Sequence, residues 1–174
     1  IAKHHAERCR CSVVVDLFCG CGGNAIQLAF SCELVIAVDI DPVKIAMAHH
    51  NARVYGVEDR IEFILGDAIQ ILPTLRFDVL FVSPPWGGPE YVKAKKFTLG
   101  MMNHPINGIE LLNLVRKAAR NIVLFLPRNT CSQHFIELLT SRDYPCEIED
   151  NYLNNKLKAK TVYLGKHLCD KTNC

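Results

Sequence analysis

The segment Ser83-Pro84-Pro85-Trp86 combines residue types that could hold an amino group beside a flat aromatic surface. Two consecutive prolines fix the backbone and remove two amide donors, which leaves the Pro84 carbonyl available as an acceptor beside the Ser83 hydroxyl. Two converging acceptors would hold the N–H bonds of an amine and direct its lone pair at an electrophile. Trp86 offers a face for a planar base. The alternative is a proline-rich turn in which Trp86 fills the core, but the glycines that follow favour an open loop.

A second group of residues could bind a nucleoside. The glycines in the turn that follows Asp16 (residues 16–24) allow a sharp bend and a close approach to a ligand. Asp39 follows the next apolar run, where a carboxylate could accept hydrogen bonds from both hydroxyls of a ribose. Asp67 ends the third apolar run and could accept from an adenine amino group. The alternative is that the glycines only shape a turn.

Two cofactor classes share this arrangement. A nicotinamide dinucleotide favours G-x-G-x-x-G, and Ala25 in place of the third glycine is allowed in the looser form of this motif, but Asp16 before the turn would repel its pyrophosphate. A carboxylate at that place suits a cationic cofactor with an amino group, such as S-adenosylmethionine. We therefore predict S-adenosylmethionine as the cofactor. The residues predicted to bind it are Asp16, Cys19, Gly20, Gly22, Asn24, Asp39, Ile40, Asp67 and Ser83.

The elements that must position these residues alternate along the chain. Apolar runs predict strands over residues 13–15, 34–38, 61–65, 77–82, 121–126, 146–153 and 159–164, and helices lie between most of them. Asp41 as N-cap and Pro42 at the first helical position predict one helix start. The alternation predicts an α/β fold: a Rossmann-like, doubly wound, mainly parallel sheet of about seven strands with helices on both faces. Ligands bind such sheets at the carboxyl ends of the strands, where the residues above lie.

The composition limits the classes of protein to which the chain can belong. The 174 residues include 20 basic and 18 acidic ones, a formal net charge of +2, and 49% are hydrophobic, which suits one globular domain and excludes a mainly disordered chain. The sequence contains no apolar run of about 18 residues that would predict a membrane span. The histidine pairs His4-His5 and His49-His50 are predicted to lie on polar, solvated helix faces.

Nine cysteines are a high and odd number. Cys32, Cys131 and Cys146 lie in apolar runs, so we interpret them as small buried hydrophobes of a reducing compartment. The Cys-x-Cys pairs at 9–11 and 19–21 could suggest zinc. The second pair falls in the turn assigned to the cofactor, so no metal site is predicted.

Five stretches together resemble a known family: Asp16-Leu17-Phe18-Cys19-Gly20-Cys21-Gly22-Gly23-Asn24, Val38-Asp39-Ile40-Asp41-Pro42-Val43-Lys44-Ile45-Ala46, Ser83-Pro84-Pro85-Trp86-Gly87-Gly88-Pro89, Phe125-Leu126-Pro127-Arg128-Asn129 and Asn154-Asn155-Lys156-Leu157-Lys158. The family is that of the trimethylguanosine synthases, RNA cap guanine-N2 methyltransferases of the class I S-adenosylmethionine-dependent type. The resemblance covers nearly the whole chain. Related amino-methyltransferases carry Asn or Asp in place of Ser83 and usually Tyr or Phe in place of Trp86.

The resemblance implies methylation of the exocyclic 2-amino group of a 7-methylguanosine cap on small nuclear and nucleolar RNAs. It implies that Ser83, Pro84 and Trp86 form the catalytic site, with Trp86 stacked on the methylated base. The residues that it implies for substrate binding are Trp86, Tyr91, Arg128, Asn129 and Lys156, of which Tyr91, Arg128 and Lys156 would contact the cap phosphates. It further implies a monomer without membrane association, with ribonucleoprotein components as candidate partners. The implied location is nuclear, in the nucleolus or Cajal body, with a cytoplasmic pool as an addition.

The resemblance also implies a division of the chain. Residues 1–10 would be the tail of an N-terminal helical extension, 11–168 the methyltransferase domain, and 169–174 a frayed end. Three alternatives remain open: an amino-methyltransferase acting on adenine N6 or on a protein glutamine, a binding module that has lost turnover, and a nicotinamide oxidoreductase. A requirement for prior 7-methylation separates the cap reaction from the first of these.

Overall fold

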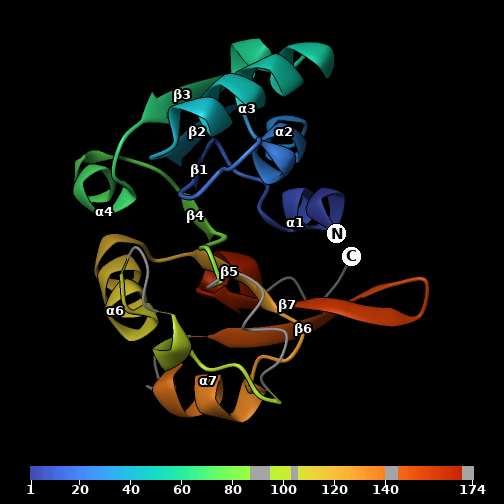
Figure 1. The fold of residues 1–174 in the computed structure, drawn as a ribbon, viewed down its shortest axis with the longest axis vertical. Coiled ribbons are helices and arrows are strands. Elements are labelled where there is room, and N and C mark those ends of the chain that lie inside the picture. The colour runs from blue at the N-terminus through green and yellow to red at the C-terminus, as the bar shows by residue number, and fades with distance from the viewer. Residues whose placement is uncertain (87–94, 103–105, 140–144, 170–174) are drawn as a thin grey trace. The chain divides into compact units, whose positions relative to one another are not determined.

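The computed structural model describes residues 1–86, 95–102, 106–139 and 145–169. The chain divides into two compact units, Ile1–Ser83 and Pro84–Cys174, called here the first and second units (Figure 1). No helix among the described residues is long and apolar enough to cross a membrane.

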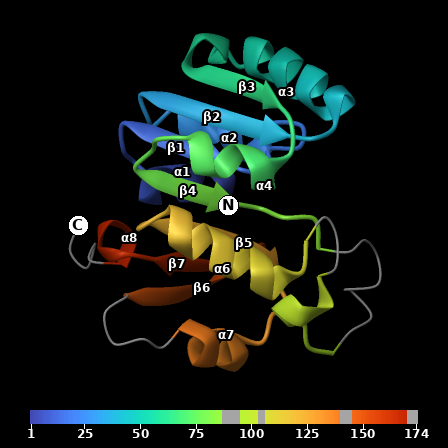
Figure 2. The same cartoon turned by 90° about the vertical axis from the view of Figure 1, so that its left-hand side faces the viewer.

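The first unit alternates strands and helices. Its strands are β1 (Val13–Asp16), β2 (Leu34–Asp39), β3 (Ile61–Leu65) and β4 (Val79–Val82), and its helices are α1 (Ala2–Arg8), α2 (Gly23–Ala29), α3 (Pro42–Val54) and α4 (Ala68–Ile71), with short 3-10 helices at Glu58–Arg60 and Leu72–Thr74. The strand order is β3-β2-β1-β4, and every pairing is parallel (Figure 2). Strands β1 and β4 are nearly fully buried and, apart from Asp16, consist of apolar residues, as expected of a parallel sheet.

The predicted start of α3 is confirmed. The Asp41 carboxylate accepts hydrogen bonds from the amides of Val43 (2.9 Å) and Lys44 (3.4 Å), and Pro42 occupies the first turn. The cap satisfies two amides that have no partner within the helix. The start of α3 thereby sets where β2 ends, at Asp39.

The second unit is antiparallel where its strands pair. It contains β5 (Ile122–Pro127), β6 (Cys146–Leu153) and β7 (Lys156–Leu164) in the order β5-β7-β6, and the helices α6 (Gly108–Ala118), α7 (Ser132–Leu139) and α8 (Lys166–Cys169), with a 3-10 helix at Leu99–Met101. Strands β6 and β7 form a hairpin closed by Asn154 (φ 52°) and Asn155 (φ 58°). Asn tolerates this left-handed conformation in two-residue turns better than most residues.

The predicted fold class is confirmed: the described residues form seven strands, mainly parallel, with helices between most of them. The last strand begins at Lys156 rather than at residue 159, because the turn is tight enough for pairing to start immediately.

Two predictions about single residues are wrong. His5 is fully buried rather than solvated, because α1 packs on α2 and its imidazole lies 5.3 Å from the Phe81 ring. Cys32 is buried as predicted, but Cys131 is half-buried and Cys146 is exposed. Cys146 opens β6, which lies at the edge of the second unit's strands, so one side of it has no neighbouring strand there.

Candidate active site

Asp16 ends β1 inside the core of the first unit. It is 1% exposed, and neither carboxylate oxygen has a hydrogen-bond partner among the described residues. Burial raises its pKa to about 7; the backbone amide of Ala25 opposes this shift, and the Asp39 charge adds to it. An unpartnered buried carboxylate is costly and is the kind of group that a cationic ligand stabilises.

The turn after Asp16 is held by backbone hydrogen bonds to two neighbouring strands. The amide of Leu17 donates to the Phe81 carbonyl, and that of Cys19 to the Val38 carbonyl, both at 2.9 Å. Gly22 (φ +85°) then caps α2, and a Cβ there would lie 3.1 Å from the Cβ of Ala48. The turn therefore needs glycine at this position both for its backbone conformation and for its packing against α3.

Asp39 ties this turn to the end of β2. Its Oδ2 accepts from the amide of Gly20 (2.9 Å) and its Oδ1 from that of Asp41 (3.0 Å). Each carboxylate oxygen can accept a further bond, so the ribose role predicted for Asp39 remains compatible with these contacts. Ile40 directly follows and is 65% exposed, which leaves an apolar side chain available beside the carboxylate.

The remaining predicted cofactor residues of the first unit have defined environments. Asp67 is half-buried and caps α4 by accepting from the Ile69 amide at 2.9 Å. Cys19 is buried, and burial together with the Asp16 and Asp39 charges raises the pKa of its thiol. The thiol therefore stays protonated and makes a poor metal ligand.

His5 is a residue that sequence reasoning missed. Burial lowers its pKa to about 4, while a hydrogen bond with the Asn24 side chain acts in the opposite direction. Asn24 is a predicted cofactor residue, so a neutral imidazole from α1 positions it. The only sequence signal was a histidine on the same face as Ala6 and Cys9, too weak to distinguish burial from exposure.

The Ser-Pro-Pro-Trp segment spans the boundary between the units. Ser83 is half-buried directly after β4, and Pro84 is buried. Trp86, in the second unit, is half-buried, its Nε1 donates to the Phe125 carbonyl at 3.2 Å, and the two rings lie 5.6 Å apart at 58°. The hydrogen bond fixes the indole, and its partial exposure favours a binding platform over the alternative of a core residue.

The predicted phosphate contacts lie in the second unit. Arg128 and Lys156 are exposed, at the end of β5 and the start of β7, and Asn129 is half-buried with its carbonyl accepting from the Phe97 amide at 2.8 Å. The ladder pairs Pro127 with Ala159, which brings the turn after β5 to the first residues of β7. The structure thus places Arg128 and Lys156 in one region, whereas Tyr91 lies outside the described residues.

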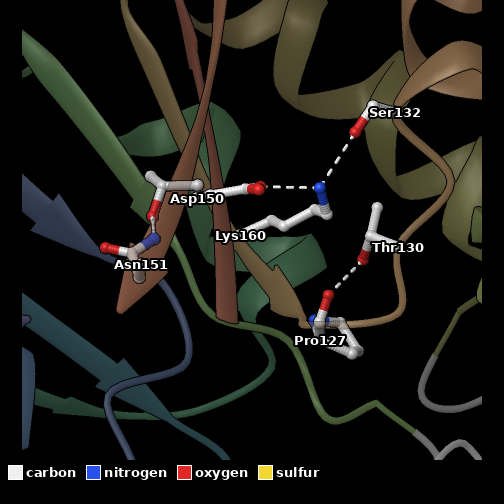
Figure 3. Close-up of polar contacts among 7 residues, drawn as sticks. Pro127, Thr130, Ser132, Asp150, Asn151 and Lys160 are labelled. Atoms are coloured by element: carbon white, nitrogen blue, oxygen red, sulfur yellow. Dashed lines mark hydrogen bonds and ion pairs between the residues drawn. The ribbon is translucent and has the colours of Figure 1, made fainter. Parts of the chain in front are cut away.

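A polar network supports this region and was not predicted. Lys160 donates to the Asp150 carboxylate at 2.6 Å and to the Ser132 hydroxyl at 3.2 Å (Figure 3). The Thr130 hydroxyl donates to the Pro127 carbonyl at 2.6 Å, closing the turn that carries Arg128. Lys160 links β6, β7 and α7 from a largely buried position, since its side chain is only 15% exposed.

The residues of the first unit fit the predicted cofactor. S-adenosylmethionine carries an ammonium group, a ribose diol and an adenine. The buried carboxylate of Asp16 suits the ammonium group, and the remaining acceptor capacity of Asp39 suits the ribose diol. Exposed Ile40 and half-buried Asp67, which follow the neighbouring strands β2 and β3, suit the adenine. The fit rests above all on Asp16, because no cationic group among the described residues compensates its buried charge.

Comparison with known proteins identifies the family and the fold of this chain. Residues 11–167 match the family described as RNA cap guanine-N2 methyltransferase. A putative methyltransferase from Porphyromonas gingivalis W83 superposes with a TM-score of 0.74 over 95% of this chain and 40% of that one, at 15% identity, which shows the fold alone.

Two curated relatives are named trimethylguanosine synthase. The protein of Schizosaccharomyces pombe is 40% identical over 136 residues, covering 75% of this chain and 56% of the relative. That of Saccharomyces cerevisiae is 38% identical over 122 residues, covering 67% and 39%. The chain thus spans about half the length of these relatives or less. Since the family match extends over most of its residues, the chain belongs to the RNA cap guanine-N2 methyltransferase family.

Proposed function

We propose that this chain transfers a methyl group from S-adenosylmethionine to the exocyclic 2-amino group of a 7-methylguanosine RNA cap. The observation that carries the proposal is Trp86, a half-exposed indole fixed by the Phe125 carbonyl in a Ser-Pro-Pro-Trp segment. The family to which the chain belongs supports the same reaction.

A tryptophan platform favours a methylated cap on physical grounds. Guanine methylated at N7 carries a positive charge, and stacking such a base on an indole adds a cation–π attraction of about 0.5–2 kcal/mol. Unmethylated guanine lacks this attraction. The platform therefore gives a reason for acting only after the first methylation.

The first unit would hold the cofactor. Asp16 would pair with its ammonium group, Asp39 would accept from the ribose hydroxyls, and Asp67 would accept from the adenine amino group. When bound, S-adenosylmethionine supplies an electrophilic methyl group on a sulfonium. Asp16, which is buried, acts in this proposal as a cofactor ligand and not as a general base.

The Ser83 hydroxyl and the Pro84 carbonyl would hold the amino group. Both act as acceptors, so they orient the N–H bonds and leave the nitrogen lone pair directed at the methyl. The amine becomes acidic only as it is alkylated, so no dedicated base is needed before that point. Positioning is the main contribution of the protein and reaches about 7–11 kcal/mol in well-oriented systems.

Arg128, Asn129 and Lys156 would bind the cap triphosphate, joined by Tyr91. Charge-assisted hydrogen bonds to phosphate are strong and depend on salt, so affinity for the cap should fall as ionic strength rises. We extend the proposal to caps of small nuclear and nucleolar RNAs, a nuclear location and ribonucleoprotein partners. This extension is supported by the resemblance to the trimethylguanosine synthases alone.

Mass spectrometry of cap dinucleotides tests the proposal. The chain is incubated with S-adenosylmethionine and either a 7-methylated or an unmethylated cap dinucleotide, with Trp86→Ala as the control variant. Methyl groups added only to the 7-methylated cap support the proposal, and their number separates mono- from dimethylation. Transfer to both caps alike removes the role of the platform. Transfer to neither cap overturns the cap reaction and favours another amino-methyltransferase or a binding module.

A further inference from the structure

The outer end of the β6–β7 hairpin, residues 152–158, is a basic and exposed part of the second unit. From Asn151 to Lys160 the sequence contains three lysines and no acid. Lys156 and Lys158 are exposed, and Tyr152 and Leu153 are 60% and 53% exposed. Figure 1 shows this end of the hairpin projecting from the rest of the second unit. Lys158 and the exposed ring of Tyr152 take no part in the proposed cap site.

Lys158 occupies a β-bulge. Asn151 pairs with Ala159, and the next residue, Tyr152, pairs with Leu157, so Lys158 is the extra residue of β7 and has no partner in β6. A bulge breaks the regular alternation and redirects a side chain, and bulges are common beside functional sites. The antiparallel ladder with β5 ends at the pair of Pro127 with Ala159, and Ala159 directly follows Lys158 in β7. Arg128 therefore follows β5 at the level of Lys158.

The base of the hairpin neutralises its own charge. Asp150 accepts from Lys160 at 2.6 Å, and Lys160 also donates to Ser132 (Figure 3). Asn151 donates to the Thr161 hydroxyl at 2.7 Å inside the same region. The acid nearest to the hairpin end is thus already paired with a lysine. The exposed cations beyond it remain available to a negatively charged partner.

We propose that the hairpin end binds the single-stranded RNA that follows the cap. Lys158 would contact a backbone phosphate and Tyr152 would stack on a base, while Arg128 and Lys156 would hold the cap triphosphate beside them. Cations that track a backbone, combined with an aromatic ring that is tolerant of sequence, are how proteins bind single strands. The inference rests on the proposed function and extends it: the preferred substrate is a cap joined to several nucleotides rather than a cap dinucleotide.

Binding of uncapped RNA tests the surface without any methylation. Fluorescence anisotropy with a labelled single-stranded 10-nucleotide RNA is measured at several salt concentrations. Lys158→Gln should reduce the slope of log affinity against log salt by about 0.7, the value for one phosphate contact on a single strand. Tyr152→Ala should weaken binding about 5-fold or more. Lys117→Gln, at an exposed lysine of α6, serves as the matched control and should change neither quantity.

Turnover gives the second measurement. Lys158→Gln should lower kcat/KM about 3- to 10-fold for a 7-methylguanosine-capped oligonucleotide and leave that for the capped dinucleotide unchanged. An equal loss on both substrates would place Lys158 at the cap itself, and an unchanged salt slope together with unchanged kcat/KM would remove it from RNA binding; either result overturns the inference. Failure of the unaltered chain to methylate any cap would overturn the proposed function instead, and the anisotropy series would still judge the surface. Unfolding temperatures of all variants are compared to exclude loss of folding.

Discussion

The two units present charge in opposite ways. In the first unit, Asp16 and Asp39 are 1% and 7% exposed and end neighbouring parallel strands. In the second unit, Arg128, Lys156 and Lys158 are exposed on a turn and a hairpin. The anionic groups are thus buried in a sheet, while the cationic groups lie on the surface.

The difference matches the two kinds of ligand proposed. A buried carboxylate without a partner loses its hydration and recovers that free energy only from a cation placed directly against it, which suits a small ligand of fixed shape. Exposed cations each contribute little and are screened by salt, but several together bind a long polyanion at many registers. Selectivity should therefore depend on geometry in the first unit and on ionic strength in the second.

The largest expected effect comes from removing the buried charge. Asp16→Asn should weaken binding of S-adenosylmethionine about 100-fold at pH 8, because breaking a buried charge pair leaves the ammonium without its partner. Isothermal titration calorimetry measures the affinity, and Asp59→Asn, at an exposed acid of the same unit, is the control. Affinities within threefold of the unaltered chain would show that Asp16 does not face the cofactor.

The next largest effect is expected from a change in the second unit, and it should impair use of the cap without affecting cofactor binding. Trp86→Ala should reduce kcat/KM for a 7-methylated cap about 30-fold, through loss of stacking and of the cation–π attraction. Cofactor affinity should stay within twofold of the unaltered chain. Trp86→Phe should recover part of the activity, since it keeps a smaller aromatic face. If Trp86→Ala also weakened cofactor binding, cap binding and cofactor binding would not be separate functions of Trp86 and Asp16.

The pH dependence of cofactor binding follows from the raised pKa of Asp16, about 7. A bound ammonium favours the ionised carboxylate, so below pH 7 the chain must release a proton to bind. Affinity should be about 10-fold tighter at pH 8 than at pH 6. Calorimetry in buffers of different ionisation enthalpy would detect the released proton. The dependence should vanish in Asp16→Asn; if it persists there, another group is responsible.

The same group affects the stability of the ligand-free chain with the opposite sign. Its folded pKa lies above the ordinary value of 3.8, so the folded state binds the proton more tightly. The stability that this proton contributes is fully present below about pH 4 and is lost as the pH rises to about 7. His5, whose pKa is lowered to about 4, acts in the other direction between pH 4 and 6.5. The contribution of Asp16 is therefore measured as the difference between the unaltered chain and Asp16→Asn in urea unfolding at each pH.

The smallest expected effect compares two glycines of the first unit. Gly22 (φ +85°) and Gly56 (φ +68°) both adopt left-handed conformations, but only at Gly22 would a Cβ meet a neighbour, Ala48 at 3.1 Å. Gly56→Ala should lower the free energy of unfolding by about 1 kcal/mol from backbone strain alone. Gly22→Ala should cost about 1 kcal/mol more from the added contact. Equal losses in urea unfolding would mean that α3 moves away to accommodate the methyl group.

Much of the fold was accessible from local patterns. Apolar runs located the strands because a strand buried on both faces needs side chains that carry no polar group. Asp41 and Pro42 predicted the start of α3, because capping depends on neighbours in the chain. The acids Asp16, Asp39 and Asp67 were also found from local patterns, because each directly follows an apolar run or its turn. The roles given to them remain predictions, since the structure shows their positions and not their ligands.

What the sequence determined by itself is the order of elements, the glycine turn and the Ser-Pro-Pro-Trp segment, all set by residues close together in the chain. Tertiary structure alone decided that His5 is buried beside Asn24, and that the buried oxygens of Asp16 meet no hydrogen-bond partner among the residues that the structure describes. It also decided that Lys158 occupies a bulge, at the level of Arg128. These features depend on packing and register between distant segments. A residue pattern fixes which face of a helix or strand is apolar, but not which residue of another segment will lie against it.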